Sequence, residues 1–528
     1  MTATTKNLSN LLEQQARLTP SREAVVQGGL RLTYAQLNAM ANQVAGGLRG
    51  LGLSAGDHIA LSCPNLPYFP IAYYGILKMG GVVVPLNVLL KPREIAYHLA
   101  DSQAKALLVF EGTAELPMAQ MARAACDETP GCAHLIVMTA NPAGPSPVER
   151  AMTLGQIMHT QAPVFASHAP APTDTAVILY TSGTTGQPKG AELTHFNMVT
   201  NAIVSRDMMA PTLDSPLAGT SRQLITLPLF HSTGQTAQMN AAISGGQTII
   251  LLPRFDAATV LQTMVDERIT CWIGVPTMYW ALLQHARQSG LDVSTVAASL
   301  RICCSGGAPM PVAVMEDFGR TFGVRILEGY GLSETSPVAC FNQVFLPSKP
   351  GTVGLPVFGC EVRVVDDQDQ PLPSGERGEI VIRGHNVMKG YFNRPAETAE
   401  ALKGGWFHTG DIGTIDADGY VAIVDRKKDM VLRGGMNVYP REIEEVLMTH
   451  PAVSLVAVIG VPDERLGEEV KAYVVLKPGA TLTPEALIEW SKEQLAAYKY
   501  PRLVEIRESL PVGPTGKVFK RALRTSDN

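Results

Sequence analysis

Residues 180–190, which read YTSGTTGQPKG, decide the fold because an apolar run over residues 176–180 leads directly into a loop of glycines and hydroxyls. Glycines permit backbone conformations that other residues avoid, so several N–H groups can point at one anion. The hydroxyls add donors, and Lys189 adds a positive charge. The Walker A pattern GxxxxGK[ST] cannot be laid on this loop. A flexible Ser/Thr/Gly loop is the alternative, but a run this long after a buried strand favours a polyphosphate site.

Strand-like and helix-like segments alternate on both sides of this loop, which predicts an α/β fold with layered sheets and helices. Thr33 and Gln36 form a capping box ahead of a helix whose apolar residues recur at helical spacing. The Pro-, Ala- and Ser-rich residues 141–173 are predicted to be a surface excursion. Further buried strands are predicted at residues 106–110, 135–138, 224–227 and 248–252.

The chain of 528 residues is too long for one ordinary hydrophobic core, so at least two domains are expected. The composition changes at the charged run DRKK, residues 425–428. We therefore predict a large N-terminal domain over residues 1–424 and a small α+β domain over residues 425–528. The small domain is expected to contain helices at residues 440–449 and 483–495 and strands at residues 455–459 and 470–476.

Composition excludes several classes of protein. Hydrophobic residues make up 46% of the chain and charged residues 17%, which is typical of a globular protein. The formal net charge of −5 argues against nucleic acid or an anionic membrane as the main partner. The eight cysteines form no C-x-x-C pair and are predicted to be reduced core residues. Neither a signal peptide nor an apolar stretch of roughly 18 residues is present, so we expect a cytoplasmic protein without an integral membrane segment.

Five later segments carry further chemistry. They are SGGAP (residues 305–309), LEGYGLSETSP (327–337), GWFHTGDIG (405–413), RGGMNVYP (433–440) and PTGKVFK (514–520). Each has an ordinary alternative when taken alone, such as a turn, a solvated linker or a surface lysine. Together with YTSGTTGQPKG they resemble, in the same order, the motifs of the adenylate-forming superfamily, which includes acyl-CoA synthetases, luciferases and peptide-synthetase adenylation domains. The resemblance covers nearly the whole chain and is strongest to the acyl-CoA synthetase and fatty-acid–CoA ligase branch.

The resemblance implies a role for each motif. Tyr330 packs on the adenine, Asp411 binds the ribose hydroxyls, and Arg426 is a second ribose or phosphate contact. Thr184 and Glu334 supply oxygen ligands to Mg²⁺. Lys517 is the catalytic lysine that bridges the acyl carboxylate and the α-phosphate. Ser333 departs from the Thr of many members but keeps the hydroxyl. The remaining positions expected to contact ATP or CoA are Thr181, Ser182, Gly183, Thr185, Gly186, Lys189, Gly306, Gly307, Ala308, Glu328, Gly329, Gly331, Arg433, Gly434 and Gly435.

The acyl pocket is placed by the same resemblance at residues 227–235, LPLFHSTGQ. His231 would flank the carboxylate entrance, although a single His on an apolar segment is more often structural. None of the other residues placed in this pocket is charged, which disfavours an amino acid as the substrate. The small residues Gly234, Ala237 and Gly306 are expected to leave room for an extended chain. The predicted substrate-contacting residues are His231, Thr233, Gly234, Gln235, Gln238, Pro337 and Val338.

The implied reaction has two steps. A carboxylate, already ionised at pH 7, attacks the α-phosphorus of ATP and yields acyl-AMP and pyrophosphate. CoA then displaces AMP after the small, mobile domain rotates about a hinge at Lys428. A medium- or long-chain fatty acid is the first candidate substrate, and an aryl or cinnamate-type acid is the second. Loading of a carrier protein in trans and a non-catalytic nucleotide-binding role remain as alternatives, and a homodimer is a family-level expectation.

Overall fold

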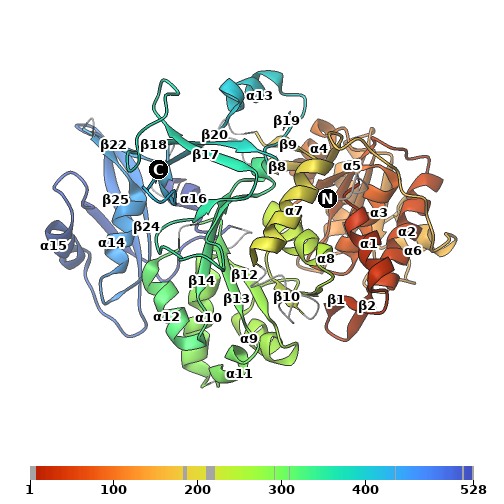
Figure 1. The fold of residues 1–528 in the computed structure, drawn as a ribbon, viewed down its shortest axis with the longest axis horizontal. Helices are drawn as coiled ribbons and strands as arrows, with labels where there is room; N and C mark the ends of the chain where they lie inside the picture. Colours follow the sequence, from red (N-terminus) through yellow and green to blue (C-terminus); the bar gives the residue numbers. More distant parts are fainter. Residues whose placement is uncertain are drawn as a thin grey trace.

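The computed structural model describes residues 7–181, 187–209, 221–290, 292–308, 310–427, 429–434, 436–513 and 517–525. These residues form four β-sheets and the helices that cover them, which confirms the predicted α/β class. Figure 1 shows the C-terminal part of the chain, in blue, packed beside the ends of the strands that carry the middle of the sequence, in green. The two large sheets both belong to the N-terminal part of the chain.

The first large sheet has eight strands. In spatial order they are β19 (Gly390–Tyr391), β9 (Lys189–Thr194), β8 (Thr175–Thr181), β4 (Val82–Pro85), β3 (His58–Ser62), β5 (Ala106–Phe110), β6 (His134–Met138) and β7 (Met152–Thr153). The second has nine, in the order β16 (Leu355–Pro356), β15 (Val338–Phe341), β14 (Ile326–Gly331), β13 (Ile302–Gly306), β12 (Cys271–Gly274), β10 (Arg222–Ile225), β11 (Thr248–Leu251), β1 (Glu23–Gln27) and β2 (Leu30–Thr33).

Two smaller sheets follow along the chain. A four-stranded antiparallel sheet has the order β17 (Cys360–Val365), β18 (Gly378–Gly384), β20 (Phe407–Ile415) and β21 (Val421–Arg426). The last sheet has the order β23 (Met436–Val438), β22 (Val431–Arg433), β25 (Gly467–Leu476) and β24 (Val453–Asp463), with β26 (Leu503–Ile506) paired to β25.

The helices cover these sheets. They are α1 (Asn10–Leu18), α2 (Tyr34–Gly50), α3 (Tyr68–Met79), α4 (Pro92–Asp101), α5 (Met118–Asp127), α6 (Leu154–His159), α7 (His195–Met209), α8 (Ala241–Ser244), α9 (Ala257–Asp266), α10 (Pro276–Ser289), α11 (Val293–Ala297), α12 (Val312–Phe322), α13 (Pro395–Ala401), α14 (Pro440–Met448), α15 (Pro484–Gln494) and α16 (Lys520–Thr525). A π-helix, η1 (Thr233–Asn240), and two 3₁₀ turns, η2 (Ser333–Thr335) and η3 (Lys403–Gly405), complete the set.

Local sequence explains the start of α2. The Thr33 hydroxyl accepts a hydrogen bond from the Gln36 N–H, and the Gln36 side chain accepts one from the Thr33 N–H at 2.9 Å. This reciprocal pair satisfies two donors that a helix start otherwise leaves free. The apolar residues predicted to face the core, Leu37, Ala41, Val44 and Leu48, are all buried. The predicted capping box and helix face are therefore confirmed.

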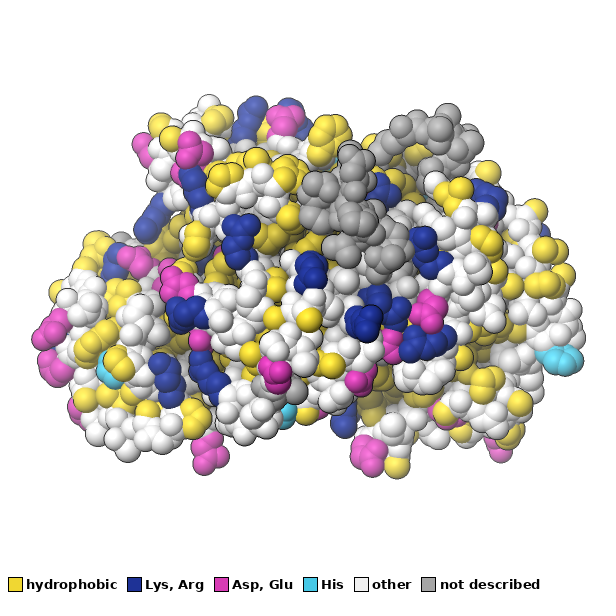
Figure 2. Space-filling model, turned by 60° about the horizontal axis from the view of Figure 1, so that its bottom comes forward, with side chains coloured by type: hydrophobic (Ala, Val, Ile, Leu, Met, Phe, Trp, Pro, Cys, Tyr) yellow, Lys and Arg dark blue, Asp and Glu magenta, His cyan; other side chains and the backbone are white. Residues whose placement is uncertain are grey.

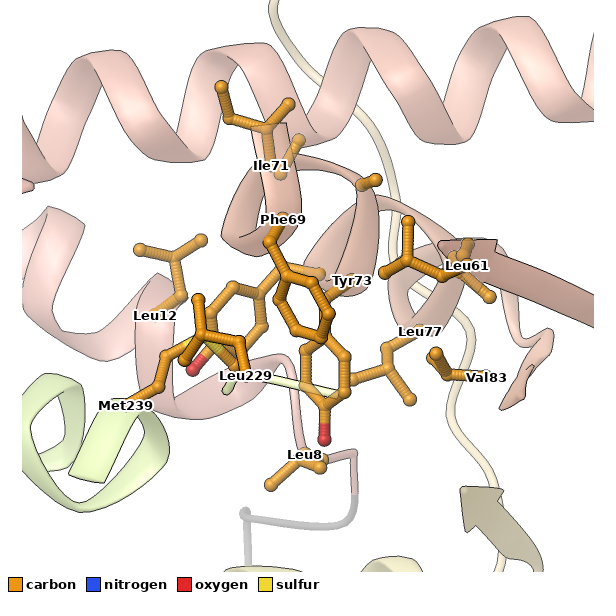
Figure 3. Packing of buried hydrophobic residues seen from close by; sticks show 14 of the residues in the cluster. Leu8, Leu12, Leu61, Phe69, Ile71, Tyr73, Leu77, Val83, Leu229 and Met239 are labelled. Carbon is orange, nitrogen blue, oxygen red and sulfur yellow. The ribbon is translucent and has the colours of Figure 1, made fainter. Parts of the chain in front are cut away.

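A core cluster joins the N-terminal helices to η1. Figure 3 shows Phe69 and Tyr73 of α3 packed among Leu229 and Met239. At the edge of this cluster the Tyr74 hydroxyl donates to Asn240 Oδ1 at 2.6 Å. Because close-packed interiors transmit displacement, this cluster fixes η1 at the back of the site described below.

Two expectations about the N-terminal domain need correction. Residues 141–173 are not only a surface excursion, because they contain β7 and α6. The Thr153 hydroxyl caps α6 by accepting the Gln156 N–H at 3.1 Å, and β7 pairs with β6 at the sheet edge. The strand expected at residues 224–227 begins earlier and ends at Ile225. Its extra length in the sequence pattern comes from a buried loop, whose apolar residues cannot be told from a strand by burial alone.

The small domain has the elements that its sequence predicts. Helices α14 and α15 and strands β24 and β25 each overlap their predicted ranges, and together they enclose a separate core. Strand β21 ends at Arg426, and the next strand, β22, belongs to the last sheet. The division between residues 424 and 425 remains a prediction. Lys428, the predicted hinge, lies outside the described residues.

The surface carries charges of both signs. In the view of Figure 2, basic and acidic side chains lie interspersed among polar and apolar ones. Seven of the eight cysteines are buried and Cys360 is partly buried, and all eight are free, as core residues would be. Among the described helices, none has both the length and the apolar character that a membrane crossing requires.

Candidate active site

Lys517 lies where the small domain meets the nine-stranded sheet. A Cβ atom added to Gly307, at the end of β13, would lie 2.8 Å from Lys517 Nζ and 2.6 Å from its Cε. Gly307 also has φ +79°, in the left-handed region that favours glycine. The lysine therefore reaches this position because residue 307 has no side chain.

The surroundings of Lys517 tune its charge. The pKa of Lys517 is lowered to about 8, because burial and the charge of Arg426 both lower it while Asp411 opposes them. The ammonium is thus the main form at pH 7 but sits close to its titration point. Two residues predicted for the nucleotide, Arg426 and Asp411, are the charged groups that act on the predicted catalytic lysine.

Asp411 is held between two partners. The Tyr330 hydroxyl donates to Asp411 Oδ2 at 2.6 Å, and Arg426 Nε lies 3.2 Å from Oδ1. The second contact follows from the sheet, because Asp411 on β20 and Arg426 on β21 are direct cross-strand neighbours. Asp411 is 4% exposed. The structure therefore brings together the three residues that the sequence assigns to adenine and ribose.

Glu334 is the second buried carboxylate of the site. The Tyr391 hydroxyl donates to its Oε1 at 3.0 Å. Burial raises the pKa of Glu334, while hydrogen bonds from the Tyr391 and Thr181 hydroxyls oppose the rise. Lys189 Nζ lies 5.5 Å from the centre of the Tyr391 ring. A carboxylate with hydroxyl oxygens beside it is the donor set that Mg²⁺ prefers, so these residues fit the metal that the sequence implies.

The loop between β8 and β9 falls partly outside the described residues. Ser182, Gly183, Thr184, Thr185 and Gly186 all lie there, as does Gly435 in the small domain. The strands at both sides of the loop are described, and Thr181 pairs directly with Lys189. This pairing places the two flanking residues next to Glu334 and Tyr391.

His231 is held as a neutral imidazole. Burial lowers the pKa of His231 to about 3, and the charge of Lys517 adds to the effect. The Thr233 N–H points at His231 Nδ1 at 3.4 Å, so Nδ1 acts as an acceptor and Nε2 carries the proton. The influence of Lys517 on His231 shows that these two predicted site residues lie near each other.

Four of the residues predicted for the acyl pocket, Thr233, Gly234, Gln235 and Gln238, lie on η1, and π-helical turns often occur at functional sites. Gln235 and Gln238 are fully buried, and each amide N–H₂ donates to a backbone carbonyl at 3.4 Å. Within the described part of the chain, neither Oε1 has a hydrogen-bond partner. The expectation of free space beside Gly234 is wrong, because a Cβ there would lie 2.2 Å from the Pro228 carbonyl oxygen. Gly234 permits close backbone packing instead.

The opposite side is built from β14 and β15. Asn201 of α7 both donates to the Val338 carbonyl at 2.8 Å and accepts from the Val338 N–H at 3.1 Å. A Cβ on Gly331 would lie 1.6 Å from the Pro337 carbonyl oxygen, so only glycine fits between these strands. Gly306 packs similarly, since its Cβ would lie 3.1 Å from the Gly329 carbonyl oxygen. These glycines act through backbone packing.

Glu328 lies on β14, next to the turn that follows β13. It is 3% exposed, and its Oε1 accepts from the Met310 N–H at 3.3 Å. Burial raises its pKa to about 7. The side chain thus supports the turn after β13, which contains Ala308. Ser333 begins η2, one residue before Glu334.

Arg433 and Gly434, predicted for CoA, are not brought to the Lys517 group. Arg433 forms a two-point ion pair with Glu469, with Nε 2.6 Å from Oε1 and Nη2 2.9 Å from Oε2. The Gly434 N–H donates to the Leu466 carbonyl at 2.8 Å. These contacts lie within the small domain and brace the β22–β23 hairpin. Sequence reasoning also missed Tyr391, since a tyrosine after a glycine carries no motif that points to Glu334.

Comparison with known proteins identifies the family. The sequence model described as AMP-binding enzyme matches residues 12–392, and the one described as AMP-binding enzyme C-terminal domain matches residues 442–517. The chain belongs to the AMP-binding enzyme family. A feruloyl-CoA synthase of Amycolatopsis is 37% identical over 519 residues, covering 97% of each chain. A long-chain-fatty-acid–CoA ligase of Bacillus subtilis is 36% identical over 540 residues, covering 98% of this chain and 94% of its own.

A solved structure agrees with these relatives. ATP-bound MatB from Rhodopseudomonas palustris has a TM-score of 0.87 and 33% identity, and the match covers 98% of this chain and 99% of MatB. This AMP-binding enzyme is therefore an AMP-forming acid–CoA ligase of the adenylate-forming superfamily.

Proposed function

We propose that this ligase activates a carboxylic acid as acyl-AMP through Lys517 and then transfers the acyl group to CoA. The observation that carries the proposal is the seating of Lys517 against Gly307, beside Asp411, Arg426 and His231. A partly buried cation among groups suited to a ribose and an acid fits the point where charge develops during adenylation.

In the first step a carboxylate oxygen bonds to the α-phosphorus, the bond to the bridging oxygen breaks, and pyrophosphate leaves. The ionised acid needs no general base. Lys517 stabilises the charge at phosphorus, while Asp411 and Arg426 hold the ribose and Tyr330 lies on the adenine. His231, as a neutral donor through Nε2, orients the incoming carboxylate. Catalysis then consists of positioning and charge stabilisation.

The phosphate end of the nucleotide is assigned to Thr181, Lys189 and Glu334 with the loop between β8 and β9. Glu334 and Thr184 would hold Mg²⁺, which neutralises phosphate charge when bound. The buried position of Glu334 and its hydroxyl neighbours support this assignment.

In the second step, Lys517 must leave the site so that the thiol of CoA can enter it. We infer that residues 425–528 rotate about Lys428 after adenylation. The β22–β23 hairpin would then border the pantetheine arm with Arg433, Gly434 and Gly435. In support, Leu432 and Met436 on this hairpin are 52% and 47% exposed, which leaves apolar surface for the arm.

For the acid itself, a medium- or long-chain fatty acid is the first candidate, because the residues of η1 carry no charge and a relative acts on long-chain fatty acids. An aryl or cinnamate-type acid is the second. It is favoured by the feruloyl-CoA synthase relative and by the unpartnered Oε1 atoms of Gln235 and Gln238, which a phenolic hydroxyl could satisfy.

The test is pyrophosphate release by the purified enzyme with ATP and Mg²⁺ across C4 to C18 fatty acids, benzoate, cinnamate and ferulate, with and without CoA. Release with no acid would contradict the proposal. Preference for ferulate or cinnamate would replace the first candidate with the second. Pyrophosphate release without any acyl-CoA would point to loading of a carrier protein.

A further inference from the structure

Helix α4 ends against the strands that flank the phosphate loop. Its last residue, Asp101, has a side chain only 11% exposed. Asp101 Oδ2 accepts from the Tyr180 hydroxyl at 2.8 Å, and Oδ1 lies 2.5 Å from Arg394 Nη2. One turn earlier, the Tyr97 hydroxyl donates to the Pro188 carbonyl at 2.8 Å. One helix thus grips three separate segments.

Two of these contacts adjoin residues assigned to the phosphates, and the third reaches the turn that carries Tyr391. Tyr180 precedes Thr181, and Pro188 precedes Lys189. Arg394 closes the turn that begins at Tyr391, since its N–H donates to the Tyr391 carbonyl at 3.1 Å. Tyr391 in turn reaches Glu334. The contacts of α4 therefore converge on Thr181, Lys189 and the turn that carries Tyr391.

The helix itself gains nothing from a carboxylate at this position. A negative charge at the C-terminal end of a helix opposes the helix dipole. The stabilisation of the Asp101 carboxylate must therefore come from its partners. In agreement, the carboxylate raises the pKa of the Arg394 guanidinium. The His98 ring adds an edge contact to the Tyr180 ring, at 4.5 Å between centres.

We propose that Asp101, Tyr97 and Arg394 are positioning residues that hold the phosphate-binding strands β8 and β9 and the Tyr391 turn in register for ATP. They act through Thr181, Lys189 and Glu334 and do not touch the substrate. The inference rests on the proposed function of those three residues.

The direct test is Asp101→Asn, which keeps the shape but removes the charge. Because displaced phosphate-contacting groups lose contacts to bound ATP, we expect the KM for ATP to rise about tenfold. The KM for the acid and the rate of acyl-CoA formation from supplied acyl-AMP should stay unchanged, since the thioester step does not use the phosphate loop. Tyr97→Phe, which deletes one hydroxyl, should have a smaller effect of the same kind. Arg394→Lys should be closer to wild type than Arg394→Gln.

Asp127→Asn is the matched control. Asp127 also ends a helix, α5, and pairs with Arg123 and Arg150 at 2.9 Å, but these partners are not the strands of the phosphate loop. It should leave every KM unchanged. If Asp101→Asn behaves like Asp127→Asn, the positioning role of Asp101 is refuted. Equal losses in both half-reactions together with a lowered Tm would also refute it, because they indicate a general structural role.

Lys517→Ala separates the two proposals. If Lys517→Ala keeps adenylation activity while Asp101→Asn raises the KM for ATP, the proposed role of Lys517 is refuted and the positioning role of Asp101 is supported. If Lys517→Ala loses adenylation activity while Asp101→Asn leaves the KM for ATP unchanged, only the positioning role of Asp101 is refuted.

Discussion

The Lys517 side chain lies directly against Gly307, just after β13. The position that a Cβ of residue 307 would fill is taken by the lysine side chain, at 2.6 Å from Cε. A glycine in SGGAP therefore does more than turn the chain, because its missing side chain leaves space for Lys517, the lysine that we propose to be catalytic.

Gly307→Ala should displace Lys517 and reduce adenylation by about 10²-fold, the usual cost of losing one group that stabilises a developing charge. Thioester formation from supplied acyl-AMP should change much less. Gly323→Ala is the control, since Gly323 also has a positive φ of +67° but nothing within 4 Å of an added Cβ. Equal effects of the two substitutions would mean that backbone strain, and not the lysine, is responsible.

The pH dependence of adenylation should report on Lys517. Because its pKa is lowered to about 8, the ammonium is present below that pH and is lost above it. The rate of the first half-reaction should fall as pH rises through about 8. No inflection between pH 5 and 7 should come from His231, whose pKa lies near 3. A profile that stays flat to pH 10 would show that the charge on Lys517 is not needed.

At the scale of elements, β14 carries a buried carboxyl group that has no full set of partners. Glu328 Oε1 accepts a hydrogen bond from the Met310 N–H, and Oε2 has no hydrogen-bond partner among the described residues. The nearest influences that oppose burial are Arg441 of α14 and backbone N–H groups, while Glu445 adds to the rise. Ionising Glu328 on β14 therefore costs free energy, because the side chain is buried.

Glu328→Gln should stabilise the protein at pH 8. The folded pKa of about 7 lies above the ordinary 4.5, so the stability that Glu328 contributes is present below pH 4.5 and is lost as pH rises through 7. A neutral amide avoids that loss, which is at most about 3 kcal/mol. The denaturation midpoint of the variant should exceed that of wild type at pH 8 and match it near pH 4.5. A constant difference at both pH values would contradict the assignment.

The alternation of strands and helices could be predicted because burial leaves a pattern in the sequence: a continuous apolar run in β5 and a helical repeat of apolar residues in α2. The motif residues Asp411, Tyr330, Arg426 and Lys517 could be predicted only through resemblance. Contacts between distant segments could not, since no period encodes them. Asp101 and Arg394 are 293 residues apart, and the Pro228 carbonyl that fills the space beside Gly234 comes from an irregular loop.

At the scale of the whole molecule, the proposed function divides the ligase into a large part that would bind ATP and the acid and a small part that would deliver Lys517. Figure 1 shows the small part against the ends of the central strands. In this arrangement Lys517 lies against Gly307. The β22–β23 hairpin contacts Glu469 through Arg433 and the Leu466 carbonyl through Gly434. The arrangement therefore suits the proposed first half-reaction, and the proposed second half-reaction would require a different one.

The measurement that tests the account most directly is the separation of half-reactions in Lys517→Ala. Removal of the ammonium should reduce acid-dependent pyrophosphate release by about 10² to 10³-fold, while acyl-CoA formation from supplied acyl-AMP stays within a few-fold of wild type. Equal loss of both half-reactions, or unchanged pyrophosphate release, would contradict the role of Lys517 in adenylation.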